Sequence, residues 1–173
     1  MRRLIAVCAV VLAACATVAM PPGVNGKLRA GYDATRVYAD ATAQALTRGR
    51  IDVPQAEQAQ GRANEALDKI GTIQDSIAAC AAPADCSDLM GQVQPLLLQM
   101  EADLRAQQKR ERSADRSLLG VITVINDATM LIGAGQALAA SVQGGATDAD
   151  VTKARASAKS AVDSLGLLIV VKR

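Results

Sequence analysis

Cysteine is the residue type in this chain whose spacing could support chemistry directly. The sequence holds four cysteines, and five residues separate Cys80 from Cys86. That separation is too long for the C-x-x-C pair of a redox enzyme. Two thiols without histidine or further cysteines do not complete the four ligands of a zinc site. Bonding to each other is the chemistry that remains, and it requires an oxidising compartment.

Other residue types offer little for catalysis. The chain contains no histidine, which removes the commonest general base and the commonest metal ligand. No phosphate-binding glycine loop, nucleophile elbow or H-E-x-x-H motif occurs. Asp127 is the one carboxylate that stands out, because it lies in an otherwise uncharged stretch, and we expect a structural role for it. The sequence therefore predicts a protein that is not an enzyme, with no cofactor and no metal ion.

Aromatic content and charge argue against nucleic acid as a partner. Tyr32 and Tyr38 are the only aromatic residues, so bases would find no stacking platform. The formal net charge of +2 lacks the strong basic excess of nucleic-acid-binding domains. No small-molecule substrate is implied either. We interpret the polar run 105–116 as a solvated helix end, with contact to an anionic surface as the alternative.

The first residues have the organisation of an export signal. Met1-Arg2-Arg3 is a basic start, and the eleven residues 4–14 are apolar and end in small residues. A run of this length is too short for a membrane span, which needs ~20 residues. Export delivers the chain to an oxidising compartment. We therefore predict a structural disulfide between Cys80 and Cys86, rather than a labile regulatory one.

The end of the apolar run resembles the lipobox of bacterial lipoproteins. The matching residues are Leu12-Ala13-Ala14-Cys15. In this family signal peptidase II cuts before the cysteine, so the resemblance implies that Cys15 begins the mature chain and carries acyl chains such as palmitate. Ala16 after the cysteine implies sorting to the outer membrane, on its periplasmic face. The alternatives are an ordinary secretory signal, with Cys15 as a bystander, and an uncleaved N-terminal anchor.

Cleavage before Cys15 would divide the chain into three parts. Residues 1–14 are the signal peptide, residues 15–26 the lipidated cysteine with a flexible tether, and residues 27–173 one helical domain. Loss of Arg2 and Arg3 reduces the 19 basic side chains to 17, which equals the 17 acidic ones. The mature chain is then neutral.

Helical spacing of apolar residues begins directly after the tether. The first helix is expected over 27–48, ending at Gly49. The residues along one side of it are Leu28, Thr35, Tyr38, Thr42, Ala45 and Leu46. The second helix begins at Asp52, where Gln55 completes a capping box. A third helix, capped by Asp85, contains Pro95, which should bend it or delay its regular start. The second helix has a seam with alternating spacings of three and four: Ala56, Ala59, Ala63, Ala66, Ile70, Ile73, Ile77 and Cys80. The third has the core residues Leu89, Val93, Leu96, Leu97, Met100 and Leu104.

Two more helices follow. The fourth, over 117–143, has two adjacent apolar stripes, which predicts burial against several neighbours. Membrane insertion is the competing interpretation, although Asp127 alone would cost ~3 kcal/mol at the centre of a span. The stripes begin with Leu118, Ile122, Ile125 and Thr129, and with Val121, Val124 and Ala128. Thr147 and Asp150 start the fifth helix, whose stripe is Val151, Ala154, Ala158, Ala161, Leu165 and Leu168.

These elements predict an all-α fold, an up-down antiparallel bundle of four to five long helices. The expected function is that of a non-catalytic binding or structural module, anchored to the outer membrane through lipid. Its partner would be an unidentified envelope protein or a second copy of the chain. The alternative is a membrane-active protein, toxin-like or associated with lysis, that inserts the helix 117–143.

Overall fold

A computed structural model of the chain describes residues 24–79, 92–110, 116–133 and 146–173. These residues form five α-helices and, within the same ranges, no strand. The helices are α2 (Val24–Thr47), α3 (Val53–Ala79), α4 (Gln94–Arg110), α5 (Arg116–Gly133) and α7 (Asp148–Lys172). They pack against one another around a shared apolar core, which confirms the predicted all-α bundle.

Successive helices alternate in direction along the bundle. A short turn joins α2 to α3, and α3 lies against α4 with Arg62 next to Asp103 and Gln55 next to Gln107, so these two helices are antiparallel. The first turns of α5 lie beside the C-terminal half of α2. At the other end, Asn25 Nδ2 of α2 donates to Asp148 Oδ1 of α7 at 2.8 Å. The first and last helices are therefore parallel, as an up-down order of five requires.

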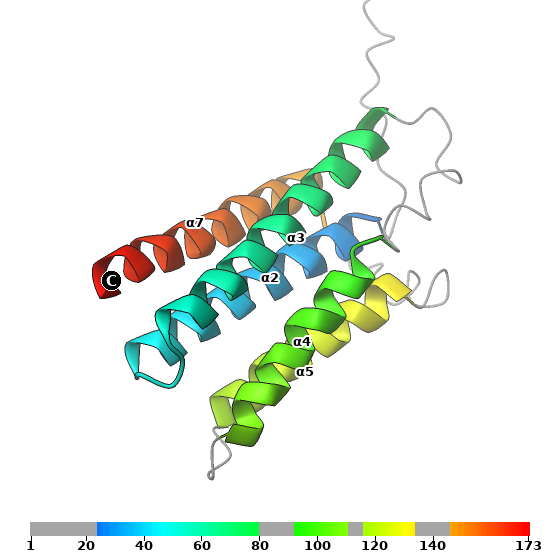
Figure 1. Cartoon of the computed structure of the whole chain (residues 1–173). Coiled ribbons are helices and arrows are strands. Elements are labelled where there is room, and N and C mark those ends of the chain that lie inside the picture. The colour runs from blue at the N-terminus through cyan, green and yellow to red at the C-terminus, as the bar shows by residue number, and fades with distance from the viewer. Residues whose placement is uncertain (1–23, 80–91, 111–115, 134–145) are drawn as a thin grey trace, which may run out of the picture.

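Helix α2 is the centre of the bundle. It packs against α3, α5 and α7, and 12 of its 24 residues are buried. Figure 1 shows α3 and α7 on one side of α2 and the hairpin of α4 and α5 on the other. Tyr32 and Tyr38 are its largest fully buried side chains, and they fill space that the small residues around them leave open. The helix begins at Val24, three residues before the predicted start.

The turn between α2 and α3 has the predicted capping groups. Gly49 adopts φ +67°, and the N–H of Arg50 donates to Ala45 O at 2.8 Å, which is the Schellman arrangement at a helix C-terminus. Asp52 N donates to Gln55 Oε1 at 3.2 Å, while Gln55 N donates to Asp52 Oδ1 at 2.9 Å. Both the glycine stop and the capping box are thereby confirmed.

The alanine-rich seam of α3 faces the core as predicted. Ile77 and Cys80 lie outside the described side chains. Glycines mark where α3 and α7 approach closely: the Arg155 guanidinium of α7 lies over Gly71, and the Gln60 amide of α3 lies over Gly166. The buried members of the seam are Ala56, Ala59, Ala63, Ala66, Ile70 and Ile73.

Helix α4 begins at Gln94, so Pro95 lies in its first turn, where its missing N–H is tolerated. Asp85 and Leu89, predicted to cap and line this helix, lie outside the described residues. From Val93 onward the predicted core side is confirmed. Its buried residues are Val93, Leu96, Leu97, Met100 and Leu104.

Helix α5 buries one of its two predicted stripes. Leu118, Ile122, Ile125 and Thr129 are buried. On the second stripe Ala128 is buried, but Val121 is half-buried and Val124 is 40% exposed. The prediction of a broadly buried surface is therefore wrong, because α5 packs mainly on α2 and α4 and these cover only part of it. Over the described ranges no helix has the length and apolarity needed to cross a bilayer, and the predicted helix 117–143 is described only as far as Gly133.

Helix α7 starts with the predicted capping box. Thr147 Oγ1 accepts from Asp150 N at 3.2 Å, and Asp150 Oδ2 accepts from Thr147 N at 2.9 Å. Two members of the predicted stripe, Ala161 and Leu168, are half-buried and pack against the edge of the core. A straight helix has 3.6 residues per turn, so a strict alternation of three and four drifts off its buried face. That face consists of Val151, Ala154, Ala158, Val162, Leu165 and Ile169.

Candidate functional site

Three polar side chains from three helices meet at the edge of the core. Tyr38 of α2 is fully buried, and its hydroxyl donates to Asp103 Oδ2 of α4 at 3.0 Å. Arg62 of α3 forms an ion pair with the same carboxylate oxygen. The side chains of Arg62 and Asp103 are 29% and 27% exposed, so they lie between core and solvent. We call Tyr38, Arg62 and Asp103 the polar triad.

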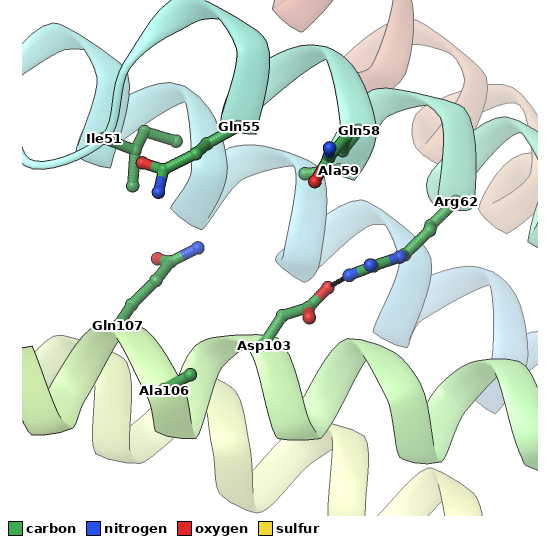
Figure 2. A pocket seen from close by; sticks show the side chains of 8 residues that line it. All are labelled: Ile51, Gln55, Gln58, Ala59, Arg62, Asp103, Ala106 and Gln107. Carbon is green, nitrogen blue, oxygen red and sulfur yellow. Dashed lines mark ion pairs between the residues drawn. The ribbon is translucent and has the colours of Figure 1, made fainter.

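A pocket of about 130 Å³ opens beside the polar triad, between α3 and α4. Figure 2 shows the side chains of Gln55 and Gln107 pointing toward each other across it. Gln107 Oε1 is buried and has no hydrogen-bond partner, whereas Gln55 Oε1 accepts a hydrogen bond from Asp52 N in the capping box of α3. The pocket is large enough to hold ordered water. Its lining residues are Ile51, Gln55, Gln58, Ala59, Arg62, Asp103, Ala106 and Gln107.

The electrostatics of the polar triad favour hydrogen bonding over proton transfer. Burial raises the pKa of Tyr38 to about 12, and the nearby Arg62 guanidinium opposes this rise only in part. The hydroxyl is therefore protonated at neutral pH and acts as a donor to Asp103. A general base works best with a pKa near the operating pH. The polar triad consequently holds three helices together, and its tyrosine hydroxyl is not suited to act as a general base at neutral pH.

The second tyrosine, six residues earlier on α2, has a similar environment. Tyr32 is fully buried, and its hydroxyl donates to Gln74 Oε1 of α3 at 2.8 Å. Burial raises its pKa to about 12. Two smaller effects act in opposite directions, since Arg155 lowers this pKa and Asp75 raises it. Arg155 Nη1 and Asp75 Oδ1 form an exposed ion pair at 3.7 Å between α7 and α3. Both tyrosines thus connect α2 to a neighbouring helix through a neutral hydroxyl.

The side chains singled out from the sequence lie outside the part of the chain that the structure describes. Cys15, Cys80 and Cys86 lie outside the described residues, so their lipidation and disulfide stay predictions. The backbone of Asp127 belongs to α5, and its side chain is outside the description. Within the described ranges, no three Cys, Asp or Glu side chains come together as possible metal ligands.

The polar triad is the feature that sequence reasoning missed. Tyr38 was expected on the core side of its helix, but nothing in the spacing of Arg62 or Asp103 marked them as its partners. The available signal was the tyrosine itself, since a buried phenol hydroxyl usually requires a hydrogen-bond partner. Comparison of the chain with protein-family models, curated proteins and solved structures gives no match. Function must therefore be inferred from the residues of this chain.

Proposed function

We propose that this protein is a bacterial lipoprotein, anchored to the periplasmic face of the outer membrane by acyl chains on Cys15. The observation that carries the proposal is the position of Cys15, directly after Leu12-Ala13-Ala14 at the end of an apolar run. One acyl chain binds a bilayer only marginally, whereas several together anchor a protein stably. Such an anchor requires no membrane-spanning helix.

The distance along the chain from Cys15 to the bundle supports this proposal. Helix α2 begins at Val24, so eight residues, 16–23, separate it from Cys15. A chain of this length spans at most about 29 Å when fully extended. The lipid anchor would therefore hold the bundle close to the membrane surface and leave its sides accessible to other envelope components.

Within the envelope we propose a non-catalytic role as a binding or structural module. Both tyrosine hydroxyls are protonated at neutral pH, and Asp103 is occupied by Tyr38 and Arg62. Long helices joined side by side provide extended protein surfaces instead. The partner we propose is an envelope protein or a second copy of this chain.

Membrane fractionation of cells that express cysteine variants tests the anchor. The wild-type protein should sediment with the outer membrane, and Cys15→Ala should be released. Cys8→Ala is the matched control, because Cys8 lies in the segment that cleavage discards. Release of both variants would contradict the proposal. A membrane-bound Cys15→Ala whose segment 117–143 is shielded from protease would instead establish the membrane-active alternative.

Peptide mapping without reduction tests the compartment independently. In a protein exported to the periplasm, Cys80 and Cys86 should be recovered as one disulfide-linked peptide. Closing so short a loop contributes about 2 kcal/mol to stability in the chain-entropy description. Recovery of both cysteines as free thiols from the native envelope would contradict export to an oxidising compartment.

A further inference from the structure

Basic side chains gather at the end of the bundle that lies away from Val24. Of the residues there whose side chains are described, five are basic and two, Asp52 and Glu57, are acidic, which gives +3 in side-chain charge. With 17 basic and 17 acidic residues in the proposed mature chain, all remaining side chains together sum to −3. The five basic residues are Arg48, Arg50, Lys109, Lys172 and Arg173.

Contacts between the helices place these residues at one end. Arg173 Nε, after the last turn of α7, donates to Glu57 Oε1 in the first turns of α3 at 2.9 Å. Gln107, two residues before Lys109, lines the same pocket as Ile51 and Gln55, which follow the turn. Figure 1 shows the C-terminus, the turn between α2 and α3, and the end of α4 on the same side of the bundle.

The same end carries the most exposed large apolar residues of the described chain. Leu167, Val170 and Val171 are 70%, 68% and 81% exposed, while Leu98, Leu119 and Val124 are all below half. Positions i, i+3 and i+4 share one helix face, and here that face points away from buried Leu165 and Ile169. We call these three apolar and five basic residues the basic apolar end.

We propose that the basic apolar end binds the surface of an anionic lipid bilayer. Basic side chains near such a surface are attracted to its headgroups, and apolar side chains beside them enter the boundary between headgroups and acyl chains. A polyanion without an apolar phase, such as the carboxylates of peptidoglycan, would use the charges but leave the leucine and valines exposed to water. A bilayer uses both features.

The position of the lipid anchor restricts how this contact can form. Val24 lies at the opposite end of α2, whose 24 residues extend about 36 Å. The tether 16–23 reaches at most about 29 Å, so the bundle cannot stand upright with its basic end on the anchoring membrane. To touch that membrane with the basic apolar end, the helices must lie obliquely. This inference rests on the proposed lipid anchor, which keeps the basic apolar end within reach of the membrane surface.

Vesicle binding of the proposed mature chain, residues 15–173 carrying Cys15→Ala and produced without residues 1–14, tests the surface without its lipid. The measurement is the partition coefficient on vesicles of phosphatidylglycerol and phosphatidylcholine, relative to vesicles of phosphatidylcholine alone. We expect preference for the anionic vesicles, weakened by added salt. Replacing Lys109 and Lys172 by Gln should lower binding to anionic vesicles about 25-fold.

Two further variants in the same background separate this proposal from general electrostatics. The matched control replaces Lys27 and Lys153 at the other end by Gln, which removes the same charge and should change binding less than threefold. Val170→Ser with Val171→Ser should also weaken vesicle binding, because the apolar contact is lost. Circular dichroism verifies that each variant folds.

Three results would overturn the proposal. The first is equal binding to anionic and neutral vesicles, and the second is equal loss in the two lysine pairs. The third concerns isolated peptidoglycan. The proposal is wrong if the protein sediments with it, the two lysine substitutions abolish this binding, and the two valine substitutions do not change it. Because the experiment uses Cys15→Ala, its failure would leave the proposed lipid anchor untouched, and failure of the anchor would leave this surface testable.

Discussion

The two tyrosines provide the only aromatic rings of the chain, and each hydroxyl binds a polar side chain of a neighbouring helix. In a core made largely of alanine, each ring fills a volume that small residues cannot. Each hydroxyl then needs an acceptor, which Gln74 and Asp103 supply. At this scale the fold depends on a few specific hydrogen bonds as well as on burial.

Alkaline pH should unfold the protein through these hydroxyls. Their pKa rises from 10.0 to about 12 on folding, so the native state holds its protons more tightly than the unfolded state. The resulting stability is fully present below pH 10.0 and is lost as the pH rises toward about 12. Absorbance of tyrosinate, which no tryptophan obscures, should show both groups ionising well above pH 10.0. Ionisation of both at the ordinary value would contradict the buried environment.

Removing Asp103 should destabilise the bundle more than removing an exposed carboxylate. Asp103→Ala leaves Tyr38 without an acceptor and Arg62 without its partner, which should cost about 1–3 kcal/mol. Asp163→Ala on the exposed side of α7 is the control and should change stability by less than about 0.5 kcal/mol. Urea unfolding measures both. Similar midpoints for the two variants would mean that the polar triad does not stabilise the fold.

The difference between these two aspartates was not visible in the sequence. Periodicity placed Tyr38 on a buried face because one helix repeat decides that face. The pairing of Tyr38 with Asp103 depends on how α2 and α4 are shifted along one another, which no local pattern records. Arg62 and Asp103 stand next to core positions of their helices and resemble ordinary solvated charges.

At the scale of elements, helix ends were the most predictable feature. Gly49, the pair Asp52 and Gln55, and the pair Thr147 and Asp150 all cap as the sequence predicts, because capping involves residues within a few positions of each other. The apolar stripes were predictable only where contact with one neighbouring helix decides which face is buried. On α5 and α7 the buried face depends on which helices lie alongside. There Val124 is exposed, and Ala161 and Leu168 are only half-buried at the edge of the core.

Two glycine substitutions should have opposite effects on stability. Gly49→Ala places a side chain at φ +67° and should destabilise the protein by about 1 kcal/mol. Gly61 is exposed within α3 and has open space around an added Cβ, so Gly61→Ala should stabilise by about 0.5–1 kcal/mol. Thermal unfolding of both variants under identical conditions is the check. A loss of stability in Gly61→Ala would show that α3 needs its glycine for contact.

At the scale of the whole molecule, the up-down order gives the bundle two unlike ends. Turns far apart in sequence lie at one end, so the ends of α2, α4 and α7, which carry Arg48, Lys109 and Lys172, are on the same side of the bundle. The sequence showed the basic residues of 105–116 but not the others that join Lys109, so a solvated helix end was sufficient explanation there. The up-down topology adds basic residues of α2 and α7 at this end, and these make binding to an anionic surface a specific proposal.

Lipidation of Cys15 is the claim on which the orientation of this molecule depends. Mass spectrometry of the N-terminal peptide, purified from the native envelope, tests it most directly. We predict a mature chain that begins at Cys15 and whose mass exceeds the mass calculated from its sequence by that of several acyl chains. An unmodified N-terminus at any other residue would contradict the anchor and the localisation that follows from it.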